Sequence, residues 1–259
     1  MSKEVRHVIN GISAVLLSAC LILAYMSGVS CRAPLECTGL DVVIADSSMN
    51  NFVSKADVKA FLDKEYGTYI GQPLDSIDLV QVEKIIDGRS AVHKSQAYIT
   101  RDGRLNIRVT QRRPMVRFQK KDGGFYADAD GFLFPLQSSY ASRVQVVDGD
   151  IPLKANSGYK GEITDPKEKE WIEKVLRMVS YMEESKTWKD KIVQMTVSDN
   201  GELTLVPREG KERFLFGQPD NIEDKFSRME MYYTGILPAK GEGKYTKISV
   251  EYDGQIVCR

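Results

Sequence analysis

Histidine, cysteine and tryptophan are scarce in this chain of 259 residues, which has two, four and two of them respectively. A protein metal centre needs several histidine, cysteine or carboxylate ligands at short spacing, and no C-x-x-C pair occurs. The catalytic patterns G-x-S-x-G and H-E-x-x-H are absent too. The sequence therefore predicts no metal site and no cofactor, and it offers no catalytic group of these classes.

Net charge is also lacking, because 36 basic residues balance 36 acidic ones. A nucleic-acid-binding domain normally carries a basic field, so we predict no nucleic-acid partner. The cysteines are too few for a disulfide scaffold. An oxidising compartment would permit one bridge among Cys31, Cys37 and Cys258; the spacing does not assign it, and Cys37 with Cys258 is one candidate pair.

One long stretch, Val8–Val29, contains no charged side chain. As a helix rising ~1.5 Å per residue it would span roughly 33 Å, which matches a bilayer core of ~30 Å. Lys3 and Arg6 precede it and only Arg32 follows closely, which favours a cytoplasmic N-terminus. We therefore predict a cytoplasmic tail at 1–7, a transmembrane anchor at 8–29, a juxtamembrane linker at 30–37 and an extracytoplasmic body.

Two other interpretations of this stretch fit the sequence less well. A cleaved signal peptide would have an apolar region of ~7–15 residues, which is shorter than this one. A lipoprotein signal fits Leu17-Ser18-Ala19-Cys20, but apolar residues follow Cys20 at once where a polar tether is usual. An uncleaved helix, with Cys20 as one small apolar residue inside it, is the favoured interpretation.

The first folded segment, 38–112, has the pattern of a small β-α-α-β-β unit. Ser54 and Asp78 are each followed three residues later by an acidic or amide side chain, as in a helix capping box. Asp102-Gly103 is a hairpin turn signal, and Leu105, Ile107 and Val109 alternate with polar residues. The predicted strands and helices are Leu40–Ala45, a helix after Ser54, a helix after Asp78, Val92–Thr100 and Arg104–Gln111.

The second segment, 113–259, is predicted to be a mixed β-rich domain with two helices. Asp165-Pro166 opens the clearer helix, with an N-cap and a first-turn proline, and a second helix carries Phe226 and Met229 on one face. A strand over Tyr245–Tyr252 comes near the end, with Ile248, Val250 and Tyr252 on one face, and Asp253-Gly254 turns into Gln255–Val257. Further strands are expected at 115–119, 124–127, 144–147, 192–198, 202–207 and 213–216.

Behind the predicted anchor the chain contains, in this order, the runs Ala91–Ile99, Asp102–Val109, Gln111–Pro114, Phe125–Asp128, Asp130-Gly131 and Phe134-Pro135. In order, in spacing and in the anchor that precedes them, these runs resemble the FtsQ/DivIB cell-division proteins. Two residues depart from the family pattern: Arg113 stands where a glutamate is usual, and Glu251 where a basic residue is common.

The resemblance implies an α+β fold: one transmembrane helix, a POTRA-like domain at 38–112 and a β domain at 113–259. It further implies a non-catalytic bitopic scaffold in the inner membrane at the division septum. The scaffold would connect FtsB/FtsL-type partners and other septal division proteins to cell-wall synthesis. A partner strand would add to an exposed edge by β-augmentation, so that Val250→Pro would abolish capture. The implied edge residues are Lys247, Ile248, Ser249, Val250, Glu251 and Tyr252.

The sequence disfavours three other functions and one further binding surface. An anchored wall hydrolase would need paired carboxylates, and Asp128 with Asp130 is the nearest candidate, although they bracket a turn. The same residues faintly resemble a calcium loop without its closing glutamate. An outer-membrane assembly factor would need a β-barrel, for which the C-terminal half is too short and too charged. The basic stretch between Arg101 and Lys121 is more typical of solvated edge strands than of a binding surface.

Overall fold

A computed structural model describes residues 3–30, 35–48 and 50–259, with the side chains of the first helix described over 11–25. That helix, α1, runs Lys3–Ser30, and its described side chains are exposed. Within the described part of the chain, no helix is both long and apolar enough to cross a membrane. The anchor therefore stays a prediction. Residues 1–2, Cys31, Arg32 and the side chains of Lys3 and Arg6 lie outside the described residues.

The described chain divides into two compact units that are not simple consecutive segments. The first unit combines 56–86 and 96–108 with the described residues up to Val43. The second contains 109–259 together with 44–55 and 87–95.

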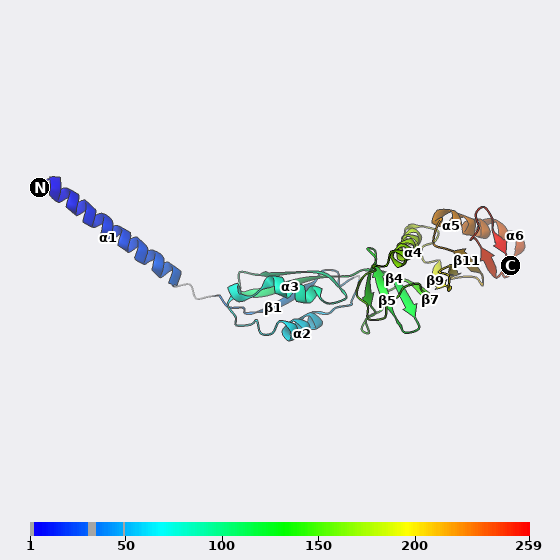
Figure 1. Cartoon of the computed structure of the whole chain (residues 1–259), viewed down its shortest axis with the longest axis horizontal. Coiled ribbons are helices and arrows are strands. Elements are labelled where there is room, and N and C mark those ends of the chain that lie inside the picture. Colours follow the sequence, from blue (N-terminus) through cyan, green and yellow to red (C-terminus); the bar gives the residue numbers. More distant parts are fainter. Residues whose placement is uncertain (1–2, 31–34, 49) are drawn as a thin grey trace. The chain divides into compact units, whose positions relative to one another are not determined.

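A three-stranded sheet has the order β1-β3-β2 and carries the predicted β-α-α-β-β succession (Figure 1). The predicted alternation is confirmed, because Leu105, Ile107 and Val109 are at most 1 % exposed. Asp78 accepts a hydrogen bond from the backbone N–H of Gln81 at 3.0 Å, as its predicted capping role requires. The elements are β1 (Gly39–Ile44), α2 (Lys55–Glu65), a 3-10 turn (Leu74–Ser76), α3 (Leu79–Asp87), β2 (Val92–Ile99) and β3 (Arg104–Gln111).

The second unit is built on a ten-stranded sheet in the order β13-β12-β11-β10-β9-β7-β4-β5-β6-β8. Neighbours far apart in sequence lie side by side: β7 pairs in parallel with both β4 and β9, and β11 with β12. The strands are β4 (Pro114–Lys120), β5 (Gly123–Asp128), β6 (Phe132–Pro135), β7 (Gln145–Gly149), β8 (Gly161–Glu162), β9 (Ile192–Val197), β10 (Leu203–Pro207), β11 (Arg213–Gly217), β12 (Lys247–Ser249) and β13 (Val257–Cys258).

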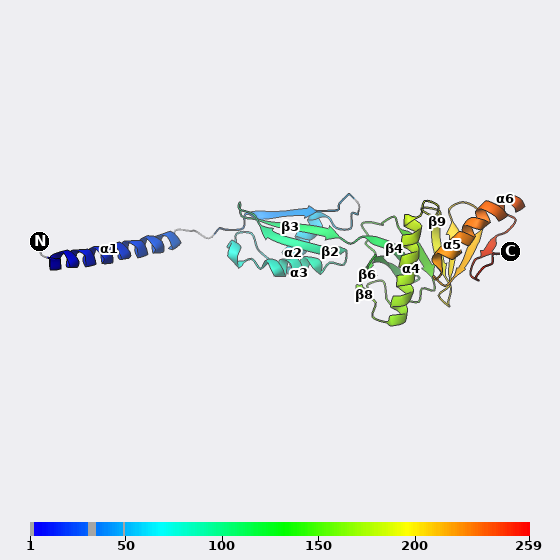
Figure 2. The same cartoon turned by 90° about the horizontal axis from the view of Figure 1, so that it is seen from above.

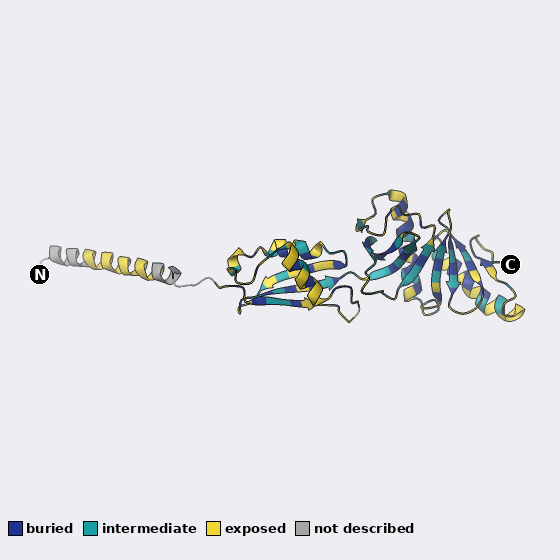
Figure 3. Cartoon of the chain, turned by 90° about the horizontal axis from the view of Figure 1, so that it is seen from below, coloured by how far each residue is buried: buried dark blue, intermediate teal, exposed yellow. Residues whose placement is uncertain are grey.

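Helices α4 (Pro166–Glu184) and α5 (Ile222–Met231) lie over the same face of this sheet (Figure 2). Asp165 caps α4 by accepting from the backbone N–H groups of Lys167 at 2.9 Å and Glu168 at 3.4 Å. The apolar stripe of α4 is buried and meets the inward-facing side chains of the central strands. The opposite face shows strands on which buried and half-buried residues alternate (Figure 3).

Past α5 the chain continues as a π-helical turn, Tyr232–Ile236, and then α6, Leu237–Lys240. The π turn was not predicted, because i→i+5 bonding has no simple sequence pattern. It keeps Tyr232 buried and places the adjacent Tyr233 half-exposed.

The candidate disulfide between Cys37 and Cys258 is wrong. Both are free thiols, and each lies in a different compact unit. Cys37 is 2 % exposed, and its thiol donates a weak hydrogen bond to the Gly39 carbonyl at 3.5 Å. The third candidate, Cys31, lies outside the described residues.

Candidate partner-binding edge

One end of the ten-stranded sheet is a short antiparallel hairpin of β12 and β13. Ile248 lies opposite Cys258, and Ser249 opposite Val257. Lys247 and Arg259 exchange backbone hydrogen bonds of 2.8 and 3.0 Å. Backbone pairs alternate between bonded and non-bonded along an antiparallel ladder, so the neighbouring Ile248–Cys258 pair is non-bonded. The N–H and C=O of Cys258 therefore point away from β12, to the free side of the sheet.

The predicted edge strand thus lies one position inside the real edge. The sequence prediction treated 245–252 as one outer strand, whereas β12 covers only Lys247–Ser249 and is flanked by β11 and β13. The Asp253-Gly254 turn brings the chain back as β13, which covers the outer side of β12. The Asp253-Gly254 pair predicts the turn, but the sequence does not specify that the segment after the turn pairs with β12.

The predicted residues divide into three groups. Ile248 and Val250 are completely buried in the core, and Ser249, whose side chain faces the opposite side of the strand, is 9 % exposed. Glu251 is half-buried and Lys247 is exposed. Tyr252 is 55 % exposed and is the only member of the set that offers a large apolar surface to solvent.

The backbone after β12 is already engaged. The Val250 N–H donates to the Leu215 carbonyl at 3.0 Å, which extends the β11–β12 ladder inward. Arg228 of α5, only 4 % exposed, donates through its guanidinium to the Tyr252 carbonyl and forms an ion pair with Asp224. The expected effect of Val250→Pro is therefore corrected: it would break the internal ladder and would not report on an outer edge.

The hairpin packs on the aromatic core beneath it. Cys258 and Ile256 are half-buried and lie against the main hydrophobic cluster. Burial raises the pKa of the Cys258 thiol above its ordinary value. Burial also raises the pKa of the nearby Tyr232 phenol, with smaller contributions from Glu212 and Cys258. Both shifts agree with the packing of these two groups against the hydrophobic cluster, while Lys247, Asp253 and Arg259 of the same hairpin are exposed.

The edge strand β2 of the three-stranded sheet is protected by side chains of α3. The Ser95 N–H donates to the Asp87 carboxylate at 2.6 Å, and the Ala97 N–H to the Glu83 carboxylate at 2.7 Å. These carboxylates occupy donors that would otherwise be available to an added strand. His93, the only histidine of the predicted body, lies on this strand with its side chain exposed.

The Asp128 carboxylate has a structural role. This role argues against a catalytic pair with Asp130 and against a calcium-binding loop. The carboxylate pairs with Arg112 at 2.8 Å and accepts from the backbone N–H groups of Asp130 at 3.1 Å and Phe132 at 3.0 Å. Asp130 is exposed at the turn. Among the described residues, no group of three or more histidine, cysteine and acidic side chains could hold a metal ion.

Several members of the basic stretch form contacts within the fold. Arg104 pairs with Asp41, Arg112 with Asp128, and the Lys120 ammonium donates to the Leu153 and Ala155 carbonyls at 2.9 and 3.1 Å. The exposed members are Arg101, Arg108, Arg113 and Lys121.

Comparison with known families adds an independent observation. Residues 113–259, more than half of the chain, match the family described as FtsQ/DivIB, C-terminal related. The chain belongs to this FtsQ/DivIB-related family. Residues 35–110 match the description POTRA-like domain, which confirms the resemblance inferred from the sequence. No curated protein matches the chain.

Membership of the FtsQ/DivIB-related family gives the two matched regions a common context. The POTRA-like match covers the three-stranded sheet and its helices, and the C-terminal match covers the whole succession from β4 to β13. FtsQ/DivIB proteins are non-catalytic cell-division proteins, so the family points to binding as the activity to look for. The β12–β13 hairpin is therefore the candidate site.

Proposed function

We propose that this chain is a bitopic division scaffold that connects FtsB/FtsL-type partners to septal wall synthesis through the outer edge of β13. The observation that carries the proposal is the orientation of Cys258, whose backbone N–H and C=O point away from β12. An added strand could bond to these groups, while Ile256 and the exposed ring of Tyr252 offer apolar contacts beside them.

The proposed edge strand is short, and its length limits the number of backbone hydrogen bonds that a partner can form. β13 has two residues, and very short edge strands are a common protection against uncontrolled pairing. A partner would gain few backbone bonds from β13 alone, so side-chain contacts must contribute much of the affinity. The exposed Tyr252 ring is the natural anchor, because aromatic residues dominate binding hot spots.

Attachment to the inner membrane through 8–29 is part of the same proposal. The helix α1 is supported in this role by apolar side chains that are at least 57 % exposed, including Ile12, Leu16 and Leu23. Exposed apolar surface is energetically unfavourable in water and favourable in the lipid interior of a bilayer. With the tail inside, the two folded units would be extracytoplasmic. A protease-protection assay on an N-terminal tag in intact spheroplasts tests this orientation, which cleavage of the tag from outside would contradict.

Two separate proline substitutions test whether the outer edge of β13 binds the partner. Cys258→Pro removes an N–H that faces outward, and proline is tolerated at such a position of an edge strand. Val257→Pro removes an N–H that bonds to Ser249, so it should loosen the hairpin itself. We expect Cys258→Pro to retain the folded sheet and to lose capture of a small coiled-coil membrane protein by photocrosslinking from position 256. Cys258→Ala, which keeps the N–H, is the matched control and should crosslink normally.

Different outcomes test the β13 interface and the role in division separately. Normal crosslinking by Cys258→Pro would refute the β13 edge. Loss of crosslinking with continued mid-cell localisation of the full chain is the expected result. An even distribution of the unmodified protein around the envelope would contradict the division role as a whole.

A further inference from the structure

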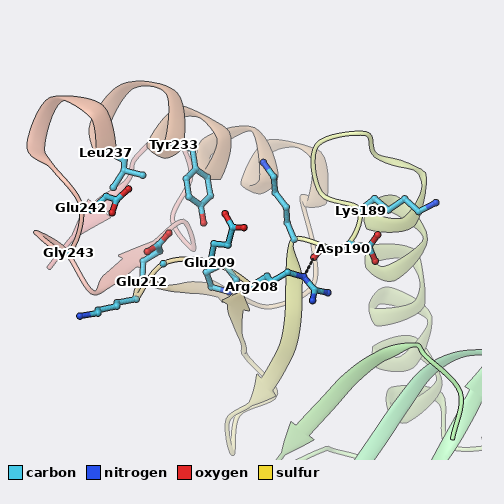
Figure 4. Close-up of a pocket in the computed structure, with 13 residues that line it drawn as sticks. Lys189, Asp190, Arg208, Glu209, Glu212, Tyr233, Leu237, Glu242 and Gly243 are labelled. Carbon is cyan, nitrogen blue, oxygen red and sulfur yellow. Dashed lines mark hydrogen bonds between the residues drawn. The ribbon is translucent and has the colours of Figure 1, made fainter.

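A second feature of the C-terminal unit is a cleft of about 890 Å³ (Figure 4). Ligand sites commonly measure about 300–1,000 Å³. The cleft lies between the ends of β9 to β11 and the π turn with α6. Its lining comes from residues 189–191, 207–212, Tyr233, Leu237, Glu242 and Gly243.

The inner wall contains a buried carboxylate. Glu212 is 7 % exposed, and its carboxylate faces Tyr233. Burial first, and then the neighbouring Glu212 carboxylate, raises the pKa of Tyr233 well above its ordinary range. Gly210 makes the arrangement feasible: its φ is +94°, and a Cβ there would lie 2.2 Å from a Glu212 carboxylate oxygen. In Figure 4 the Tyr233 side chain points from the helix toward Glu209 and Glu212.

The cleft is lined by as many basic side chains as acidic ones. The Lys191 ammonium lies 5.7 Å from the ring centroids of both Trp188 and Tyr233. Arg208 donates from Nε to the Asp190 carbonyl at 2.8 Å, which fixes the guanidinium at the rim and leaves its two terminal nitrogens for other partners. Lys189 and Lys211 also belong to the lining and are exposed to solvent, and the Lys189 side chain extends away from the cleft in Figure 4.

The charge pattern selects a class of ligand. A purely anionic ligand would meet Glu212, Glu209 and Glu242, and a purely cationic one would meet the four basic side chains. A dipolar ligand satisfies both sets, because an ammonium can approach Glu212 while a carboxylate reaches Arg208 or Lys211. The half-buried Tyr233 ring and Leu237 offer apolar contact for the chain between the two charges.

We propose that this cleft binds a short zwitterionic peptide, with its ammonium directed at Glu212 and its carboxylate at Arg208 and Lys211. The π turn supports a binding role, since it is the irregular element that presents Tyr233 to the cleft and such turns are frequent at functional sites. The proposal is independent of partner capture at β13, because it uses none of the edge residues.

Isothermal titration of the full chain in detergent tests the proposal with defined probes. The tripeptide Lys-Ala-Glu with free ends should bind saturably, and tricarballylate and spermidine should each bind at least tenfold more weakly. Glu212→Gln keeps the shape of the side chain and removes its charge, and it should weaken tripeptide binding at least tenfold. Lys211→Glu, an exposed position that leaves the fold intact, should weaken it by a similar factor.

Glu230→Gln is the matched control, because Glu230 is exposed on α5 and does not line the cleft. It should leave the affinity within twofold. No saturable binding of the tripeptide, equal binding of all three probes, or unchanged affinity of both Glu212→Gln and Lys211→Glu would each overturn the proposal. Capture at β13 by the photocrosslinking assay should be unaffected by these cleft variants.

Discussion

The buried ion pair between Arg112 and Asp128 should contribute strongly to the stability of the second unit. The two side chains are 12 % and 8 % exposed, and their nearest charged atoms are 2.8 Å apart. The Arg112 guanidinium also lies 3.5 Å from the centroid of the Phe132 ring. Asp128→Ala would leave this cation buried without its partner, and it would remove the acceptor for two backbone N–H groups.

Breaking a buried pair in this way costs about 3–5 kcal/mol. Urea unfolding slopes reach about 3 kcal/mol per M, so the midpoint for Asp128→Ala should fall by roughly 1–2 M. The chain has two tryptophans, and both Trp171 and Trp188 lie in the core of the second unit. Tryptophan fluorescence of the full chain in detergent therefore follows the unit that contains the pair.

The control is Asp130→Ala, which alters the exposed neighbour and should change stability by less than about 0.5 kcal/mol. A double variant, Arg112→Met with Asp128→Ala, should recover part of the loss, because an apolar side chain leaves no unpaired charge. If Asp128→Ala unfolds at the same urea concentration as the unmodified chain, the pair contributes no net stability and the reasoning is wrong.

Three further predictions follow from particular contacts. Gly149→Ala should cost at least about 1–3 kcal/mol in the same assay, because φ is +92° and a Cβ would lie 2.2 Å from the Val197 carbonyl oxygen; unchanged stability would contradict that conformation. Glu83→Ala should uncover the Ala97 N–H on β2, cost about 1–3 kcal/mol and promote self-association seen by analytical ultracentrifugation, with exposed Glu65→Ala as the control. The backbone N–H of Lys167 and the ammonium of Lys154 lower the pKa of Asp165. The stabilising effect of its carboxylate should therefore be complete above about pH 4 and shrink as pH falls through the lowered value; a pH-independent stability difference between the unmodified chain and Asp165→Asn would refute this.

Local structure was largely predictable because it depends on short-range chemistry. Alternation placed Leu105, Ile107 and Val109 in the core, and side-chain capping placed helix starts after Asp78 and Asp165. The meander of β9, β10 and β11 was also predicted, since each turn joins strands that are adjacent in sequence. The family resemblance supplied the division into a POTRA-like region and a C-terminal domain, and the family matches confirm both descriptions.

Tertiary structure alone decided the rest. The parallel pairing of β7 with β4 spans two intervening strands, and that of β7 with β9 spans the long helix α4; no local pattern specifies such partners. The same limit affects the candidate edge, where the position of β13 outside β12 depends on a single reversal of direction at Asp253-Gly254. The cleft is likewise formed by segments that meet only on folding. Sequence periodicity determines which face of an element is buried, whereas the identity of the neighbour is set by the packing of the whole sheet, and here that neighbour determines which strand is free to bind.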